Sequence, residues 1–261
     1  MQSSLADVLV RYRSTAPLVH CLTNNVVTAF TANVVLASGG APAMVDNPHE
    51  AAEFAAIAGG VLVNLGTPQD HTVEAMKLAA ASAHEHDVPW VLDPVAAGGI
   101  GWRTEQAIAL LDHRPAIVRG NASEILGLTG GAGGKGVEST DTADAALAAA
   151  HAIATATGAV VAISGATDHL TDGQRVVLLS NGHPLMTKVT GVGCALGALM
   201  AGFAAVTDDR LLAAAAATTL LCLAAEDAPK QGPGSFAVGL LDGLARIRPE
   251  QLAARVKWDE A

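Results

Sequence analysis

The segment Thr190–Cys194 places two glycines and a cysteine directly before a long apolar stretch, Ala195–Val206. The apolar stretch predicts a helix, and the first turn of a helix carries backbone N–H groups without acceptors inside the helix. These N–H groups and the positive end of the helix dipole favour a bound anion such as a phosphate. Cys194 would lie on that turn, where the thiolate is favoured. For a G-x-G motif alone, a tight turn with the cysteine as core filler is the alternative.

Further side chains that suit phosphate chemistry follow the predicted strands. Five short apolar runs have the character of buried strands: Val61–Leu65, Val88–Leu92, Ala116–Val118, Ala159–Ile163 and Val176–Leu179. The residues after the first four runs are Gly66 with Thr67, Asp93, Arg119 to Glu124, and Ser164 with Gly165. Because ligands of open α/β sheets bind beyond the carboxyl ends of the strands, we expect these residues at one sheet edge.

These residue types are typical of phosphoryl transfer from a magnesium nucleotide. Asp93 and Glu124 form a carboxylate pair for the metal ion, and Arg119 can neutralise phosphate charge. Each also has a structural alternative. Asp93 precedes Pro94 and is a common turn former, Glu124 suits the first turn of a helix, and Arg119 could form a surface ion pair. Their shared position after strands favours the functional interpretation.

The elements that must position these residues alternate between strands and Ala-rich helical stretches. This pattern predicts an α/β fold with a mostly parallel sheet covered on both faces. Helix starts are marked at Asn47–Glu50 and Thr67–Asp70, each with a capping side chain before a proline. The two apolar segments Val192–Val206 and Leu211–Ala225 predict a hairpin of buried helices. No linker or repeat divides the chain, so residues 1–261 are expected to form a single domain.

The composition excludes several classes of protein. Hydrophobic residues make up 51% of the chain and charged residues 15%, which excludes a disordered protein. The net charge of −10 argues against nucleic acid and anionic membrane surfaces as partners. The N-terminus has no apolar signal core, and the apolar segments are too short to span a membrane. Cysteines at 21, 194 and 222 form no C-x-x-C pair, which suits a reducing cytoplasm.

A second glycine-rich stretch, Gly130–Gly136, matches G-x-G-x-x-G but lies in the wrong context. It follows a predicted helical stretch, Glu124–Leu128, and not a strand, which argues against a dinucleotide site. A Walker loop is excluded because Lys135 is followed by glycine, not by the Ser or Thr that would hold magnesium. We interpret the stretch as a surface loop.

At this point the chain resembles the hydroxyethylthiazole kinase family. The resemblance is carried by Pro17–Thr28 with its Thr-Asn-Asn element, Leu92-Asp-Pro-Val95, Arg119-Gly-Asn-Ala-Ser-Glu124, Thr187–Cys194 and Gly232-Pro-Gly-Ser-Phe236. It extends from about Leu18 to Phe236. Two positions depart from the family pattern: Ala96 replaces a usual glycine, and Pro68 follows Thr67. Neither carries a reacting group.

The resemblance implies a ribokinase-like three-layer αβα sandwich that phosphorylates 4-methyl-5-(2-hydroxyethyl)thiazole with ATP for thiamine biosynthesis. It also implies a homotrimer with active sites between subunits. By resemblance, Asn24, Val26, Met44, Gly66 and Gly191 line the thiazole pocket. The implied ATP-binding residues are Arg119, Asn121, Ser164 and Gly165, and the implied Mg²⁺ ligands are Asp93 and Glu124, partly through waters. The expected catalytic group comprises Cys194, as acceptor of the hydroxyl proton, with the amides of Gly191 and Gly193.

Three alternatives remain at this stage. They are a related small-alcohol kinase such as a hydroxymethylpyrimidine kinase, a non-catalytic nucleotide or vitamin sensor of the same fold, and a structural assembly protein. Met44 alone would more often fill a core than bind a ligand. His84 and His86 are two residues apart, do not share a helix face, and are expected to be solvated. His20 is expected to anchor the Thr-Asn-Asn segment.

Overall fold

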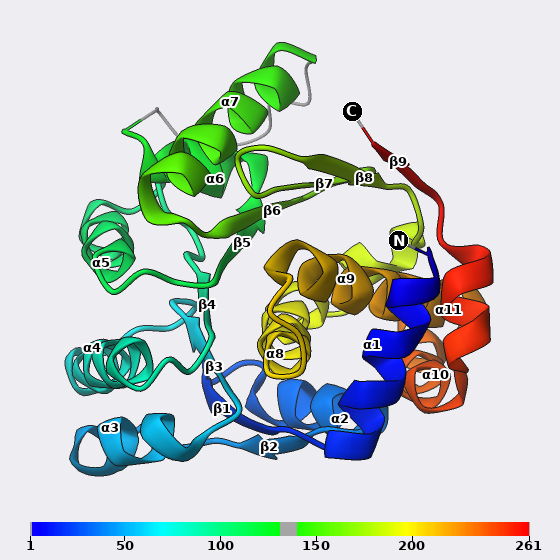
Figure 1. Cartoon of the computed structure of the whole chain (residues 1–261), viewed down its shortest axis with the longest axis horizontal. Helices are drawn as coiled ribbons and strands as arrows, with labels where there is room; N and C mark the ends of the chain where they lie inside the picture. Colours follow the sequence, from blue (N-terminus) through cyan, green and yellow to red (C-terminus); the bar gives the residue numbers. More distant parts are fainter. Residues whose placement is uncertain (1, 131–139, 261) are drawn as a thin grey trace.

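The computed structural model describes residues 2–130 and 140–260, and within them the chain forms one nine-stranded sheet (Figure 1). The strand order is β2-β1-β3-β4-β5-β6-β7-β8-β9. The strands are β1 Leu18–Leu22, β2 Ala41–Ala43, β3 Gly60–Asn64, β4 Trp90–Asp93, β5 Ile117–Asn121, β6 Val160–Ser164, β7 Asp168–Thr171, β8 Val176–Leu179 and β9 Trp258–Glu260. Pairing is parallel from β2 to β6 and antiparallel from β6 to β9, which confirms the mostly parallel sheet.

Helices cover both faces of the sheet and make three layers. They are α1 Gln2–Thr15, α2 Thr28–Ser38, α3 Pro48–Ile57, α4 Asp70–Glu85, α5 Gly101–Leu111, α6 Ala122–Leu128, α7 Thr140–Thr157, α8 Val192–Ala204, α9 Arg210–Asp227, α10 Pro233–Arg246 and α11 Pro249–Arg255, with a 3₁₀ turn, η1, at Pro184–Lys188. Figure 1 shows α3 to α7 on one side of the sheet and α1, α2 and α8 to α11 on the other. Each side has its own apolar core.

The five predicted strands are confirmed within two residues at each end, except for β5, which runs three residues further. The helix predicted from Asn47 is confirmed, because Asn47 Oδ1 accepts the His49 amide at 3.0 Å. The predicted start at Thr67 is wrong. There the helix begins at Asp70 with Gln69 as N-cap, because Thr72 accepts the Gln69 amide and closes the first turn.

Two regions bear on the expectations about loops and membranes. Residues 131–139, which hold most of the predicted glycine-rich surface loop, lie outside the described residues. In the part of the chain that is described, no helix is long and apolar enough to cross a membrane. The two apolar segments instead form the helices α8 and α9, which pack against each other, and most of their residues are buried.

Small residues bring α8 close to the sheet. Gly60 on β3 lies directly against the backbone of Ala201, so that a Cβ atom there would collide with the Ala201 carbonyl. One turn earlier, a Cβ atom on Gly197 would lie 2.8 Å from Leu62 of the same strand. Because a side chain at either position would push helix and strand apart, these glycines set the depth at which α8 packs. They thereby place the first turn of α8 at the carboxyl edge of the strands.

Candidate active site

The predicted anion loop forms the N-terminus of α8. Gly191 is the N-cap residue, with a φ of 89°, and no side chain caps the helix. The backbone bond from the Ala195 amide to the Gly191 carbonyl, 2.8 Å, closes the first turn. The amides of Val192, Gly193 and Cys194 therefore precede that bond and can point to a ligand, as expected at a helix start. Two features favour glycine at position 191: its positive φ, and the close approach of Val27, whose Cγ1 would lie 2.7 Å from a Cβ atom there.

A continuous hydrogen-bond network joins the strand ends next to this loop. Asn64, at the end of β3, lies in its centre and is fully buried. Its Oδ1 accepts Asn24 Nδ2 at 2.8 Å, and its Nδ2 donates to Asp93 Oδ2 at 2.7 Å. Asn24 Nδ2 also donates to Cys194 Sγ at 3.5 Å. The network thus connects the Thr-Asn-Asn segment to α8 on one side and to β4 on the other.

Arg119, at β5, extends the network toward β6. Its Nη1 donates to Asp93 Oδ2 at 3.2 Å and its Nη2 to Ser164 Oγ at 2.7 Å. The guanidinium is buried against the first turn of α8, because a Cβ atom on Gly193 would lie only 3.2 Å from Nη1. A fixed positive charge therefore lies next to the anion loop and adds to the attraction of its amides.

Asp93 and Glu124 have the features of ligands for a partly hydrated magnesium ion. Asp93 is fully buried, and its Oδ1 has no hydrogen-bond partner among the described residues. Burial raises the pKa of Asp93 to about 6; the charge of Arg119 opposes this rise and the charge of Glu124 adds to it. A cation would favour the charged carboxylates. Mg²⁺ takes one or two protein carboxylates, water and phosphate oxygens, so this pair fits it.

Glu124 also has a structural role that the sequence left open. Its Oε2 accepts the Asn121 amide at 2.8 Å while Asn121 Oδ1 accepts the Glu124 amide at 2.9 Å, a capping box at the start of α6. Its Oε1 accepts the Ala96 amide at 3.0 Å. These bonds fix the carboxylate beside Asp93 and leave lone pairs on both oxygens. Asn121, predicted to bind ATP, lies at this cap.

The expectation that Cys194 favours its thiolate is wrong. Burial raises the pKa of the thiol, and the negative charge of Asp93 raises it further. The hydrogen bond from Asn24 and the charge of Arg119 act in the opposite direction but do not outweigh these effects. Cys194 is therefore a thiol at neutral pH.

The predicted thiazole residues lie on the α8 side of the network. Gly66 lies so close to Asn24 that a Cβ atom would be 2.5 Å from Asn24 Nδ2, and its amide donates to Asn64 Oδ1 at 3.0 Å. Val26 is 64% exposed, in the turn next to Gly191. Met44 follows β2, two strands from Asn64, and packs partly buried against the core. The structure thus joins Asn24 and Gly66 directly, joins Asn24 to the first turn of α8 through Cys194, and places Val26 and Met44 at the same sheet edge.

A cavity of about 670 Å³ opens on the opposite side of the network. Arg119, Ser164, Gly165 and Gly193 line one end of it. Further walls come from residues 180–184, from Met186 and Thr187, and from Leu221 and Cys222 of α9, none of which was predicted as a site residue. The volume and the mixed polar and apolar lining are those of a small-molecule site.

Two further residues of the site escaped the sequence analysis. Asn64 was counted as part of an apolar strand, although a lone Asn two residues before Gly66 is a detectable signal. Asp168 lines the cavity, and its Oδ1 accepts the Gly165 amide at 2.9 Å.

Of the histidines, His84 and His86 are exposed, as expected. His20 is buried, and its Nε2 bonds to the Val45 carbonyl at 2.7 Å. It therefore anchors the segment after β2 and not the Thr-Asn-Asn segment.

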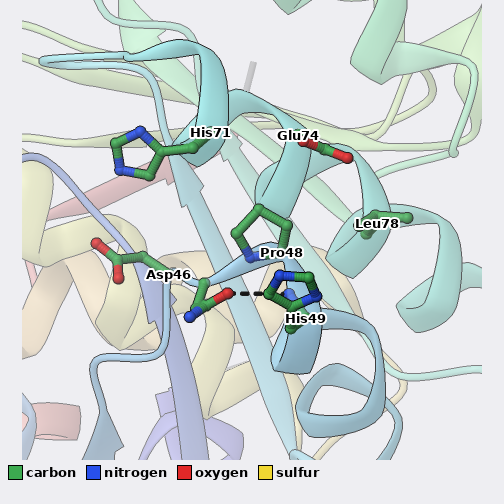
Figure 2. A pocket seen from close by; sticks show the side chains of 7 residues that line it. Asp46, Pro48, His49, His71, Glu74 and Leu78 are labelled. Carbon is green, nitrogen blue, oxygen red and sulfur yellow. Dashed lines mark hydrogen bonds between the residues drawn. The ribbon is translucent and has the colours of Figure 1, made fainter.

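A separate hollow of about 790 Å³ lies between the first turns of α3 and α4 (Figure 2). Its polar lining includes Asp46, His49, His71 and Glu74. Among the described residues, no three His, Cys, Asp or Glu side chains form a group that could hold a metal ion. The hollow shares no lining residue with the 670 Å³ cavity.

The described residues have a ribokinase-like fold, with an anion loop, a buried arginine–carboxylate pair and a cavity at one sheet edge. A solved ribokinase-like superfamily protein from Enterococcus faecalis V583 has the same fold, with a TM-score of 0.66 at 15% identity over 94% of this chain and 95% of that one. Residues 9–250 match the model of the Hydroxyethylthiazole kinase family. The chain belongs to that family.

Individual relatives agree with this assignment. A hydroxyethylthiazole kinase from Clavibacter sepedonicus is 55% identical over 251 residues, which is 95% of this chain and 91% of the relative. The solved hydroxyethylthiazole kinase from Pyrococcus horikoshii OT3 superposes with a TM-score of 0.91 at 35% identity, covering 98% of both chains. The predicted kinase class, family and fold are confirmed.

Replacing Asp168 by asparagine is expected to stabilise the protein at neutral pH. Burial raises the pKa of Asp168 to about 6 from its ordinary 3.8, so between these values the folded protein holds a proton that the unfolded chain has released. The stability that this proton contributes is present below about pH 4 and is lost as the pH rises through about 6. Asparagine keeps an acceptor for Gly165 and carries no charge.

Chemical denaturation measures the outcome at two pH values. Asp168→Asn should raise the free energy of unfolding by about 1–2 kcal/mol at about pH 7.5, and the gain should shrink toward zero at about pH 4. A difference between variant and wild type that does not change with pH would contradict this assignment.

Proposed function

We propose that the protein transfers the γ-phosphoryl group of ATP to the primary hydroxyl of 4-methyl-5-(2-hydroxyethyl)thiazole, giving the thiazole phosphate for thiamine biosynthesis. The observation that carries the proposal is the position of the α8 amides and Arg119 between two sites. On one side lies the Asn24–Gly66 pair, and on the other the cavity lined by Ser164 and Gly165. An acceptor alcohol and a nucleotide on these two sides would meet at the anion loop.

The residues of the chain act mainly by positioning and charge neutralisation. The amides of Gly193 and Cys194 and the guanidinium of Arg119 bind the oxygens of the migrating phosphoryl group. The hydroxyl oxygen forms the new bond to phosphorus as the bond to ADP breaks. Because the transition state is loose, the hydroxyl proton leaves late and passes to an oxygen of the transferred phosphoryl group or to water. Cys194, a thiol with a raised pKa, therefore orients the hydroxyl and is not a preformed base.

We infer that Asp93 and Glu124 hold the Mg²⁺ ion of magnesium-ATP, partly through waters. The unpartnered Oδ1 of Asp93 and the fixed carboxylate of Glu124 support this assignment. When bound, the ion neutralises charge on the β- and γ-phosphates. Asn121 stands at the cap next to Glu124, which is consistent with a contact to ATP.

We also propose that residues 1–261 act as one kinase domain in a reducing cytoplasm. One sheet runs through the described residues from β2 to β9, and the three cysteines, all described, are free thiols. Thiols that remain free suit a reducing compartment.

The alternatives differ in the acceptor or in the loss of catalysis. A hydroxymethylpyrimidine kinase would use the same anion loop without the Thr-Asn-Asn segment, which here is tied to Cys194 through Asn24. A vitamin sensor would have no need for the buried Arg119–Asp93 pair beside the loop.

Release of ADP tests the function directly. With Mg²⁺ and ATP, the purified protein should release ADP on addition of the thiazole alcohol and release much less with a pyrimidine or sugar alcohol, because the pocket around Asn24 is specific for the acceptor. A coupled ADP assay across the three alcohols measures this. Equal rates with all three, or release only with the pyrimidine, would contradict the assignment of the thiazole as substrate.

Glu124→Gln is expected to reduce kcat by about 10²-fold or more, whereas Cys194→Ser reduces it by about tenfold or less. Glutamine loses the charge that binds the metal and sets an N–H₂ group against a backbone donor. Excess Mg²⁺ should restore part of the activity of Glu124→Gln and none of that of Cys194→Ser. Steady-state kinetics across a Mg²⁺ titration, with thermal melts of both variants, measures this. If Cys194→Ser were as inactive as Glu124→Gln, Cys194 would be an obligatory base.

We propose a homotrimer with active sites between subunits. The supporting observation is a set of exposed apolar side chains: Val26, in the turn before α2, is 64% exposed, Leu36 57% and Ile57 68%. Burial of such side chains against a second copy removes apolar surface from water. Light scattering should give three times the chain mass of 26.2 kDa, and Ile57→Lys should lower that mass. A wild-type protein of single-chain mass that is fully active would contradict this proposal.

A further inference from the structure

One wall of the 670 Å³ cavity is a loop that is held in place by contacts with other parts of the chain. Residues 180–184 run from the end of β8 into η1, and all five line the cavity. Gly182 has a φ of 129°, which residues other than glycine rarely adopt. A Cβ atom there would lie 3.5 Å from Sγ of Cys222, which also lines the cavity. The loop therefore follows one tight path between β8 and α9.

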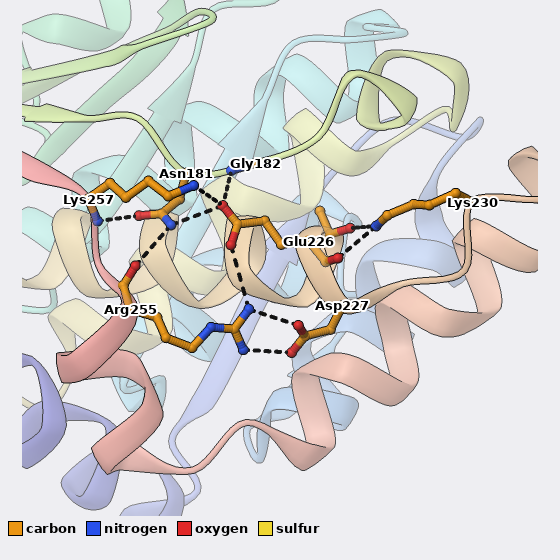
Figure 3. A network of polar contacts seen from close by, with 8 residues as sticks. Asn181, Gly182, Glu226, Asp227, Lys230, Arg255 and Lys257 are labelled. Atoms are coloured by element: carbon orange, nitrogen blue, oxygen red, sulfur yellow. Dashed lines mark hydrogen bonds and ion pairs between the residues drawn. The ribbon is translucent and has the colours of Figure 1, made fainter.

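The support comes from a polar cluster behind the loop, which Figure 3 shows. The side chain of Asn181 is buried, and its Nδ2 donates to Glu226 Oε1 and to the Arg255 carbonyl, both at 3.1 Å. Its Oδ1 accepts the Lys257 amide at 2.6 Å. The Gly182 amide also donates to Glu226 Oε1, at 3.2 Å. Both loop residues are thus held through one carboxylate oxygen.

The partners of this cluster come from two distant parts of the chain. Glu226 lies in the last turn of α9, one turn beyond Cys222, which lines the cavity. Arg255 and Lys257 precede β9, and the Ser180 amide bonds to the Lys257 carbonyl at 2.9 Å where β9 joins β8. Lys257 Nζ pairs with Glu226 Oε1 at 3.1 Å. The cluster therefore connects the cavity floor, the cavity wall and the C-terminal strand.

The charge state of Glu226 suits this role. Partial burial raises its pKa, but the hydrogen bonds from Asn181, Lys257 and the Gly182 amide outweigh burial and lower it. The carboxylate is therefore charged at neutral pH and accepts strong hydrogen bonds. Its neighbour Asp227 forms a bidentate ion pair with Arg255, 2.8 Å for both bonds, and makes no hydrogen bond to residues 180–184.

We propose that Glu226, acting through Asn181 and Gly182, is a positioning residue that holds the 180–184 wall against the nucleoside part of the phosphate donor. Arg119 and Gly193 mark the phosphate end of the cavity, so the wall beyond them faces the nucleoside. The proposal rests on the proposed function, because it takes this cavity as the ATP site. Affinity for ATP then depends on a carboxylate on the far side of the loop.

Three variants separate this role from general stability. Glu226→Ala removes the acceptor, Glu226→Gln keeps an oxygen in the same place, and Asp227→Ala removes only the neighbouring ion pair. Glu226→Ala should raise KM for ATP about five- to tenfold through two lost hydrogen bonds, with kcat and KM for the thiazole alcohol changed by less than about twofold. Glu226→Gln should recover most of the loss, and Asp227→Ala should leave KM for ATP unchanged.

Two results would overturn the proposal. One is an unchanged KM for ATP in Glu226→Ala, and the other is an equal rise in Glu226→Ala and Asp227→Ala, which would indicate loosening of the C-terminal region as a whole. If Glu226→Ala does not fold, Asn181→Asp tests the same contact, because it keeps the acceptor for Lys257 and sets two carboxylates against each other. It should raise KM for ATP alone, and an unchanged KM would again overturn the proposal.

Calorimetry with a non-hydrolysable ATP analogue and the wild-type protein distinguishes this inference from the proposed function. If the wild type binds the analogue and the Glu226 variants bind it equally well, only the positioning role fails. If the wild type neither binds the analogue nor releases ADP with the thiazole alcohol, the proposed function itself fails.

Discussion

The buried ion pair between Arg119 and Asp93 is the interaction on which the site depends. Both side chains are almost completely removed from water, and such a pair is favourable only when further hydrogen bonds satisfy its remaining donors and acceptors. Asn64 and Ser164 supply one such bond each from the neighbouring strands, and Asp93 Oδ1 and Arg119 Nε have no protein partner among the described residues. The pairing of Asn64 with Asp93 across β3 and β4 puts the amide in reach of the carboxylate. The charge of the site is therefore held by the ends of four adjacent strands.

The first turn of α8 lies at this charged sheet edge and divides the site into two sides. Its first turn rests on Arg119 because Gly193 has no side chain, and its body approaches the sheet because Gly60 and Gly197 have none. Asn24 and Cys194 lie on one side of it, and the cavity lies on the other. Small residues thus determine where the amides and the guanidinium converge. The chemistry needs little else from the protein, since a loose phosphoryl transition state is stabilised mainly by position and charge.

The cavity side of the network is assembled from more distant parts of the chain than the side at Asn24 and Gly66. The wall at residues 180–184 is held by α9 and by the strand β9 near the C-terminus. The antiparallel extension of the sheet, β7 to β9, therefore has a role beyond closing one edge: it brings Arg255 and Lys257 behind the cavity wall, where both bond to Asn181.

Local sequence rules were sufficient for β3 to β6 of the parallel part and for several residues at their carboxyl ends, but they did not predict β1 and β2. Asp93, Arg119 and Ser164 were predicted together because parallel strands end on the same side of a sheet, whatever the order in which the strands pair. The anion loop followed from two glycines before an apolar helix, and the cap at Asn47 from its own four residues. These inferences need only neighbours in sequence or the general geometry of parallel sheets.

Only the tertiary structure determines the properties of the site that depend on residues far apart in the sequence. The pKa of Cys194 is raised by burial and by Asp93, whose position relative to α8 no local pattern contains, so reasoning from the helix dipole alone failed. Asn64 is a site residue only because Asn24 and Asp93 lie on either side of it. The cavity wall exists only once β9 has paired with β8. Burial and electrostatic interactions are set by distances in space, and sequence patterns report those distances only within a helix turn, a strand or a cap.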